Sequence, residues 1–358
     1  MIECDKMRYE DRIRSQRLFV LGAGFSAAAG VPMTGSLLAS AMERFKAECP
    51  GIFSRIDGYV RACFQFGNSD PDYTRLSLSE ICTFLHYIEL REYGGGERWS
   101  NAGSRENLAL RFYLAKEIAL STPNVDQIPQ LYRDFAAQLH PGDIVFSFNW
   151  DTLLELSLEA ASMPYAYQVE ENRVTLIKLH GSINWRLGPP DTTDKKQWHS
   201  FGFTEGMMTS DVYWTRELIG SYSWRHIPGP LEEVRPFIVL PGFGKAFDVR
   251  HLAPFWYKPE FAFGFTHDIF IVGLSLARDD FIIRSLFLDN LPHVKGSSGV
   301  SRRTVIINPD PLVRDNFSFL VGNPRVDFVG DPFSEAHIAL MKPALRDDLE
   351  NTVEKGYG

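Results

Sequence analysis

The sequence predicts an α/β protein: a Rossmann-like parallel sheet with helices on both faces, plus a mainly helical inserted module. Two observations predict this fold class. Seven short runs rich in Val, Ile, Leu and Phe are almost continuously hydrophobic and do not alternate with polar residues, which is typical of strands buried on both faces of a parallel sheet. Helical patterns lie between several of these runs, for example at residues 152–161 and 279–290.

The predicted strands are spread along most of the chain. In order, they are residues 18–21, 143–148, 174–179, 236–240, 268–273, 304–308 and 326–330. Residues 186–235, which lie between the third and fourth strands, are irregular and rich in Trp, Gly, Ser and Thr. We therefore expect a smaller insertion at this point.

A long helical region separates the first two strands. The stretches LLASAMERFKAE, LSEICTFLHYIELREY and NLALRFYLAKEIAL carry apolar residues at helical spacing, and Gly94-Gly95-Gly96 indicates an exposed loop between helices. We predict three parts: a Rossmann-like domain from residues 1–35 and 141–333, a helical insertion module from 36–140, and a helical C-terminal tail from 334–358.

The composition is that of a globular protein, with 44% hydrophobic and 23% charged residues. A net charge of -8 argues against general binding to phosphate backbones, so we expect no direct contact with nucleic acid. Residues 18–42 carry no charge, but this stretch contains four glycines and a proline and its compact apolar part is short. We therefore expect no membrane-spanning segment.

The four cysteines all lie in the first quarter of the chain, at Cys4, Cys49, Cys63 and Cys82, with no C-x-x-C pair. Metal sites and disulfide frameworks normally show tighter or paired spacing. We expect reduced thiols, no metal site and a cytoplasmic location.

Small or polar residues follow six of the predicted strands. They are Gly22–Ser26, Asn149–Asp151, His180–Ser182, Pro241–Lys245, Leu274–Ser275 and Asn308–Asp310. In an open parallel sheet, ligands bind beyond the carboxyl ends of the strands. A turn or a helix cap would also explain each stretch by itself, and it is their recurrence that favours a ligand site.

The stretch GAGFSA, which begins at Gly22, matches the G-x-G-x-x-G/A pattern of dinucleotide-binding loops. Glycines after a buried strand let the backbone approach a pyrophosphate. The position of the usual ribose-binding acid falls at Glu43, inside a helical run instead of at the end of a second strand. An ordinary nicotinamide or flavin oxidoreductase is therefore a poor fit.

Five motifs in the same order resemble those of the sirtuins. GAGFSAAAGVP resembles their glycine-rich loop, FNWD their Asn-containing segment, LHGS their catalytic His-Gly, GLSL their Gly-Thr-Ser-Leu loop, and INPD the Ile-Asn segment near the adenosine. Two departures mark the branch. Met33 follows Pro32 where deacylase sirtuins have Asp-Phe-Arg, and no cysteine follows Cys82 to form their zinc module. The segments FNWDTLLE, KLHGSINW and IVGLSLARDD resemble bacterial sirtuin-like domains of antiphage defence systems.

The resemblance implies an NAD glycohydrolase that cleaves NAD to nicotinamide and ADP-ribose and depletes NAD in abortive infection, with NAD as substrate and no zinc. For catalysis, Asn149 would orient a ribose hydroxyl or the attacking water, His180 would act as general base, and Asp151 would stabilise developing positive charge. The residues expected to bind the dinucleotide are Gly22, Ala23, Gly24, Ser26, Pro32, Ser275 and Asn308.

Other interpretations stay open at this point. The chain is alternatively an NAD-dependent protein deacylase without zinc, or a non-catalytic sensor of NAD or ADP-ribose. Asp151 also has the position of a cap for the helix that starts at Thr152, and a histidine before glycine is often structural. By resemblance to two-component defence systems we expect a HerA-like ATPase partner. The amphipathic helices of the insertion offer surfaces for self-assembly, so we also expect a homo-oligomer, with the insertion acting as a gate on an activity that would otherwise harm the cell.

Overall fold

The computed structural model describes the chain from Arg17 to Lys342 with several gaps. The described residues are 17–64, 70–90, 104–190, 197–201, 211–230, 234–256, 262–263, 266, 268–277, 280–290, 303–321 and 326–342. The predicted loop at Gly94–Gly96, residues 1–16 of the first domain and residues 343–358 of the predicted tail lie outside them.

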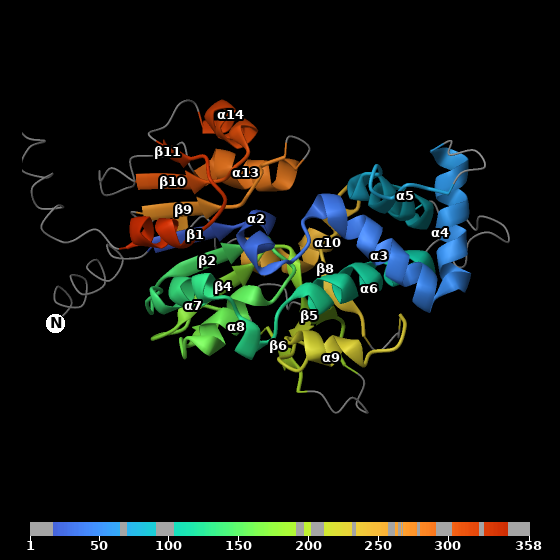
Figure 1. The fold of residues 1–358 in the computed structure, drawn as a ribbon, viewed down its shortest axis with the longest axis horizontal. Coiled ribbons are helices and arrows are strands. Elements are labelled where there is room, and N and C mark those ends of the chain that lie inside the picture. Colours follow the sequence, from blue (N-terminus) through green and yellow to red (C-terminus); the bar gives the residue numbers. More distant parts are fainter. Residues whose placement is uncertain are drawn as a thin grey trace, which may run out of the picture.

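A seven-stranded sheet with only parallel pairings forms one half of the molecule (Figure 1). Its order is β11-β10-β9-β1-β2-β4-β3. The strands are β1 (Arg17–Leu21), β2 (Ile144–Ser147), β3 (Tyr165–Ala166), β4 (Val174–Lys178), β9 (Asp268–Val272), β10 (Arg303–Ile307) and β11 (Val326–Val329). Every residue of β1, β2 and β4 is buried, so the predicted parallel sheet with strands covered on both faces is confirmed.

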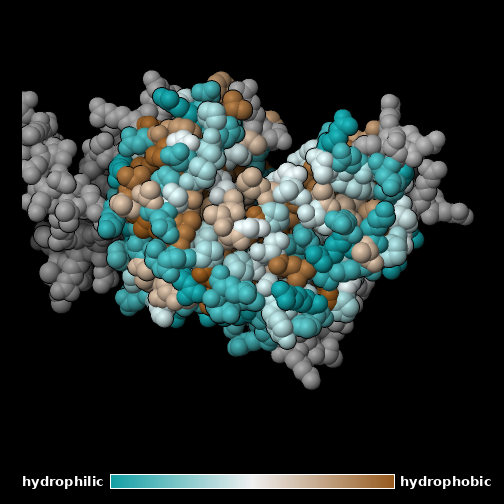
Figure 2. Space-filling model, viewed as in Figure 1, coloured by the Kyte–Doolittle hydropathy of each residue, from teal (hydrophilic) through white to brown (hydrophobic). Residues whose placement is uncertain are grey.

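Helices connect these strands and pack on the sheet. They are α7 (Gln130–Ala137), α8 (Leu153–Ala160), α13 (Phe281–Asn290), α14 (Pro311–Val321) and α15 (Glu335–Ile338). Apolar residues of α7, α8, α13 and α14 share one hydrophobic core with the strands, which explains why the strands are apolar on both faces. On the face drawn in Figure 2 apolar residues appear over α14, where Leu312 and Phe319 are exposed, within a largely hydrophilic surface.

The prediction of a parallel strand at residues 236–240 is wrong. β8 (Pro236–Ile238) pairs antiparallel with β5 (Gly181–Leu187) in a separate four-stranded sheet of order β6-β7-β5-β8. Residues 186–235 supply β6 (His199–Ser200) and β7 (Val212–Trp214) to this sheet. β8 is apolar because it is buried on both sides: Phe237 packs in the core of the parallel sheet and Ile238 in the core of the helical module. Its composition therefore resembles that of a central parallel strand.

The helical region after the first strand has its own hydrophobic core. Its helices are α3 (Thr34–Glu48), α4 (Pro50–Cys63), α5 (Leu78–Leu90) and α6 (Ser104–Ser121), and Figure 1 shows them grouped on the side of the molecule away from β10 and β11. Among the described residues, no single helix has the length and apolar composition to cross a membrane, and the one pair that passes both criteria together, Ala23–Ala29 with Thr34–Glu48, is bent by 62°.

The turns after β1 and β9 touch backbone to backbone. The Gly24 amide donates to the carbonyl of Gly273 at 3.0 Å. A Cβ atom on Gly22 would lie 2.6 Å from the Cα atom of Leu274, and one on Gly273 would lie 2.3 Å from the backbone nitrogen of Phe25. Gly273 also has a φ of +65°. Glycine is therefore required at these positions by the close approach of the two turns.

Replacing Gly273 with Ala should lower the free energy of unfolding by more than about 2 kcal/mol, because the new Cβ clashes with backbone and the positive φ is strained. Gly58→Ala is the matched control, since Gly58 lies inside α4 and a Cβ added there would meet nothing within 4 Å; it should be neutral or stabilising by up to about 1 kcal/mol. Urea unfolding measures both. Equal stability of the two variants would contradict the argument.

Candidate functional site

Asn149 and His180 lie side by side at the carboxyl edge of the parallel sheet. Ser147 at the end of β2 is in register with Lys178 at the end of β4, and the two site residues each follow two positions later. The ring of His180 contacts that of Phe148, with centroids 5.0 Å apart. The sheet therefore brings together two residues that the sequence predicted from separate motifs.

The Asn149 amide joins this edge to the turn after β1. Its Nδ2 atom donates a hydrogen bond to the hydroxyl of Ser26 at 3.1 Å, and both side chains are buried. Its Oδ1 atom is buried and has no hydrogen-bond partner among the described residues. Since buried polar atoms are nearly always paired, this oxygen is an acceptor available to a ligand or to water.

His180 is buried and neutral. Burial lowers the pKa of its imidazole well below the ordinary value of 6.5, and the positive charge of Lys245 lowers it further, against a hydrogen bond to the Phe148 backbone that raises it. Its Nε2 atom, like Asn149 Oδ1, has no hydrogen-bond partner in the described part of the chain. A neutral imidazole with one open nitrogen can accept a proton or a hydrogen bond.

Lys245 was not among the predicted site residues. It begins α10 (Lys245–Val249), directly after the glycine-containing stretch that follows β8. The buried ammonium forms an ion pair with Asp280, whose Oδ1 lies 2.6 Å from Nζ. The sequence contained a signal for this residue, because Lys245 directly follows an apolar run and two glycines, as a ligand-binding residue after a strand would. Its acidic partner, distant in sequence, was not predictable.

Asp151 lies one residue before Thr152, the N-cap residue of a helix. Its Oδ1 atom accepts a hydrogen bond from the Leu153 amide at 3.0 Å, where α8 begins. Its backbone carbonyl accepts a hydrogen bond from the ammonium of Lys178. These contacts match the helix-cap interpretation, and the catalytic role of Asp151 stays a prediction.

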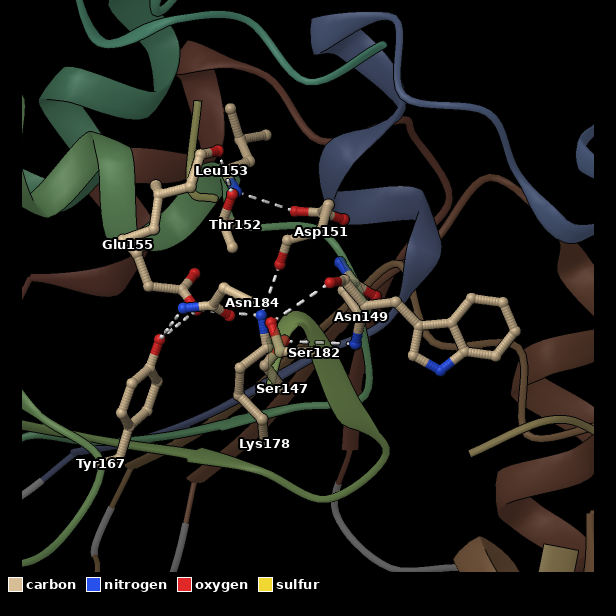
Figure 3. A network of polar contacts seen from close by, with 12 residues as sticks. Ser147, Asn149, Asp151, Thr152, Leu153, Glu155, Tyr167, Lys178, Ser182 and Asn184 are labelled. Atoms are coloured by element: carbon tan, nitrogen blue, oxygen red, sulfur yellow. Dashed lines mark hydrogen bonds and ion pairs between the residues drawn. The ribbon is translucent and has the colours of Figure 1, made fainter. Parts of the chain in front are cut away.

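A buried polar network supports the Asn149–Asp151 segment from behind (Figure 3). Lys178 and Glu155 form an ion pair of 3.0 Å and are each 1% exposed. The Tyr167 hydroxyl donates to Glu155 at 3.0 Å, and Asn184 donates to that hydroxyl at 3.2 Å. Burial and the nearby Glu155 carboxylate raise the pKa of Tyr167 well above 10, so this phenol stays a donor.

The predicted dinucleotide-binding residues of the first turn lie where the motif places them, but their amides are partly in use. α2 (Ala23–Ser26) and a 3-10 turn follow β1 directly. The amides of Gly22 and Gly24 donate to the backbone carbonyls of Val272 and Gly273, at 2.9 and 3.0 Å. Ala23 is exposed and Pro32 half-buried. A ligand at this turn would therefore meet a surface of small side chains, with few backbone amides left to donate hydrogen bonds to it.

Ser275 and Asn308 lie beyond the neighbouring strands β9 and β10. The buried Asn308 side chain donates to the carbonyl of Leu274 at 3.2 Å and accepts from the Asp310 amide at 2.9 Å. Asn308 thereby holds the turn after β9. Ser275 follows β9 at the same edge of the sheet and is exposed.

Among the described residues, no three or more His, Cys, Asp and Glu side chains come together as a set that could hold a metal ion. Cys49, Cys63 and Cys82 are free thiols. Burial raises the pKa of Cys82 to about 12, which keeps this thiol protonated.

No protein-family model and no curated protein matches the chain. Among solved structures, it is similar to a Sir2 enzyme at 14% identity, covering 96% of this chain and 97% of that chain with a TM-score of 0.41. It is also similar to a Sir2 homologue in complex with NAD, at 14% identity, 99% and 95% coverage and a TM-score of 0.35, and to a Sir2 bound to a p53 peptide and NAD+, at 13% identity, 97% and 98% coverage and a TM-score of 0.37. At these values the likeness carries no argument about activity.

The pKa of His180 predicts a pH-dependent stability. The unfolded chain binds a proton on this imidazole below about pH 6.5, whereas the folded chain does not, so the free energy of unfolding falls as the pH decreases through 6.5. Between pH 7.5 and 5.5 the wild type should lose about 1 kcal/mol more than His180→Gln. Urea unfolding of both proteins at several pH values measures the difference. Parallel pH profiles would show that His180 titrates normally in the folded protein.

The Lys178–Glu155 pair predicts a second stability effect. Lys178→Met should destabilise the fold by about 3–5 kcal/mol, because it leaves the Glu155 carboxylate buried without its cation. Adding Glu155→Gln removes that charge and keeps an acceptor for Tyr167, so the double variant should recover most of the loss. Chemical denaturation of the three proteins tests this. A double variant no more stable than Lys178→Met would contradict the burial argument.

Proposed function

We propose that this chain hydrolyses NAD at the bond between nicotinamide and ribose, releasing nicotinamide and ADP-ribose. The observation that carries the proposal is the pair of buried atoms without hydrogen-bond partners among the described residues, Asn149 Oδ1 and His180 Nε2. They lie at the carboxyl edge of a parallel sheet, where ligands of open α/β sheets bind, beside a turn of small residues.

The residues around this pair suit a dinucleotide. The exposed Ala23 and the half-buried Gly24 let a diphosphate lie against the turn after β1. Because two amides of this turn are already hydrogen-bonded, the exposed hydroxyl of Ser275 is assigned to the phosphate. Asn308 holds the turn after β9 through its hydrogen bond to the Leu274 carbonyl, and the adenosine ribose binds beside this turn.

For this hydrolysis the protein has to position the ribose and the attacking water, accept a proton, and stabilise the positive charge that develops on the ribose. When the glycosidic bond breaks, its electron pair leaves with the nicotinamide nitrogen and positive charge develops on the ribose ring. A water then bonds to the anomeric carbon and gives up a proton. Asn149 Oδ1 orients that water or a ribose hydroxyl, the neutral His180 accepts the proton at Nε2, and the Asp151 carboxylate stabilises the positive ring.

The low pKa of His180 fits this sequence of events. A strongly electrophilic ribose carbon requires only a weak base, and an imidazole that stays neutral does not add positive charge beside the developing cation. A protein deacylase would need room for an acyl-lysine at the same edge, and a sensor would need neither a base nor an oriented water.

We place this activity, on the resemblance of its motifs, in an NAD-depleting antiphage effector of the cytoplasm. In that setting the chain forms a homo-oligomer that a HerA-like ATPase partner controls, and the module of α3 to α6 carries the gate. Mass in solution and NAD turnover, measured with and without such an ATPase, test this part separately.

Purified protein should release nicotinamide from NAD in the absence of any acylated peptide. Asn149→Ala and His180→Ala should each lower turnover by about a hundredfold or more, as loss of a positioned base or orienting group typically does. His226→Ala, at an exposed histidine after α9 (Ser221–Arg225), is the matched control and should keep full turnover. Nicotinamide assays with circular dichroism measure activity and fold together.

Two results would replace this function by another. Nicotinamide release that depends strictly on an acyl-lysine peptide would identify a deacylase. Tight NAD binding without turnover, unaffected by His180→Ala, would identify a sensor.

A further inference from the structure

A cavity of about 380 Å³ lies between the helical module and the small antiparallel sheet. Its walls come from α5, α6, β8 and α10 with the turn after it. Neither Asn149 nor His180 lines it, and the turn after β1 does not reach it. It is therefore separate from the site at the carboxyl edge of the parallel sheet.

The lining of this cavity is strongly basic. Three arginines and two histidines surround it, whereas Asp248 is the one carboxylate among its described lining residues; the basic residues are His86, Arg111, Arg235, Arg250 and His251. The chain as a whole carries a net charge of -8. The guanidinium groups of the three arginines form a local concentration of positive charge on an acidic protein, which attracts a small anion.

Only part of this charge is neutralised by the protein. Arg111 pairs with Asp248 at 3.0 Å and also donates to the carbonyl of Ile238. His251 pairs with the half-exposed Asp211 at 3.0 Å. The guanidinium of Arg250 is exposed and makes no hydrogen bond or ion pair with the described residues. The positive charge of Arg250 therefore remains available in the lining of the cavity.

The cavity also has apolar walls. Phe247 and Leu108 both line it and are 43% and 44% exposed. The exposed phenyl ring of Phe247 can stack against a flat ring of a ligand, while the guanidinium groups lie nearby. A ligand that combines phosphate with a planar base has both properties, and the volume is in the range of small-molecule sites.

We propose that this cavity binds a nucleotide. Arg235 and Arg250 contact the phosphate, and Phe247 stacks on the base. Arginine suits this role because its planar group binds phosphate through two hydrogen bonds.

The experiment is calorimetric titration of the full chain with AMP, the smallest probe that carries both groups. Wild-type protein should bind AMP, and Arg235→Gln/Arg250→Gln should weaken binding at least about tenfold, as loss of charge-assisted hydrogen bonds does. Arg314→Gln, at an exposed arginine on α14, is the matched control and should bind as the wild type does. Ser275→Ala, which alters the candidate NAD site, should also leave AMP binding unchanged.

Four outcomes would overturn the proposal. Wild-type protein that does not bind AMP has no nucleotide site here. If Arg235→Gln/Arg250→Gln binds AMP as tightly as the wild type, AMP does not bind in this cavity. If Ser275→Ala no longer binds AMP, the binding site is the carboxyl edge of the sheet. Inorganic phosphate that binds as tightly as AMP shows a simple anion site without recognition of the base. Because the readout is binding, the result does not depend on whether the chain hydrolyses NAD.

Discussion

The contact between the turns after β1 and β9 determines how the carboxyl edge of the sheet is built. β1 and β9 are neighbours in the sheet, so their chains leave it at the same edge and must pass each other. Glycines at Gly24 and Gly273 let the two backbones approach to hydrogen-bonding distance. That approach fixes the short helix after β1 and places Ser26, whose hydroxyl holds the Asn149 amide.

The same contact changes what the glycine-rich motif means. The glycines are explained by the neighbouring turn, and two of their amides are consumed by it. A Gly-x-Gly pattern after a strand is therefore no measure of phosphate binding in this chain. The stronger sign of function is the pair of acceptors, Asn149 Oδ1 and His180 Nε2, that folding buries without satisfying them from the described residues.

The local pattern of apolar and polar residues in the sequence was enough to predict most strands of the parallel sheet and part of the candidate site. Six continuous apolar runs identified β1, β2, β4, β9, β10 and β11, and the strand-end rule placed Asn149 and His180 together. The two-residue β3 is too short to leave a pattern. β8 was assigned to the wrong sheet because Phe237 is buried in one core and Ile238 in the other, and burial on both sides gives the same composition as a central parallel strand. Lys245–Asp280 depends on a tertiary contact that no local spacing encodes.

Long-range contacts also join the helical module to His180. Arg111 on α6 holds the carbonyl of Ile238 in β8, and the next residue, Val239, donates its amide to the carbonyl of His180 at 2.8 Å. Arg111 also pairs with Asp248 on α10, the helix that begins with Lys245. Since the charge of Lys245 helps to lower the pKa of His180, the module that holds α10 also sets the conditions under which that imidazole stays neutral. Through α10 the helical module thus affects the electrostatic environment of the site, although it contains none of the residues that the motifs predicted.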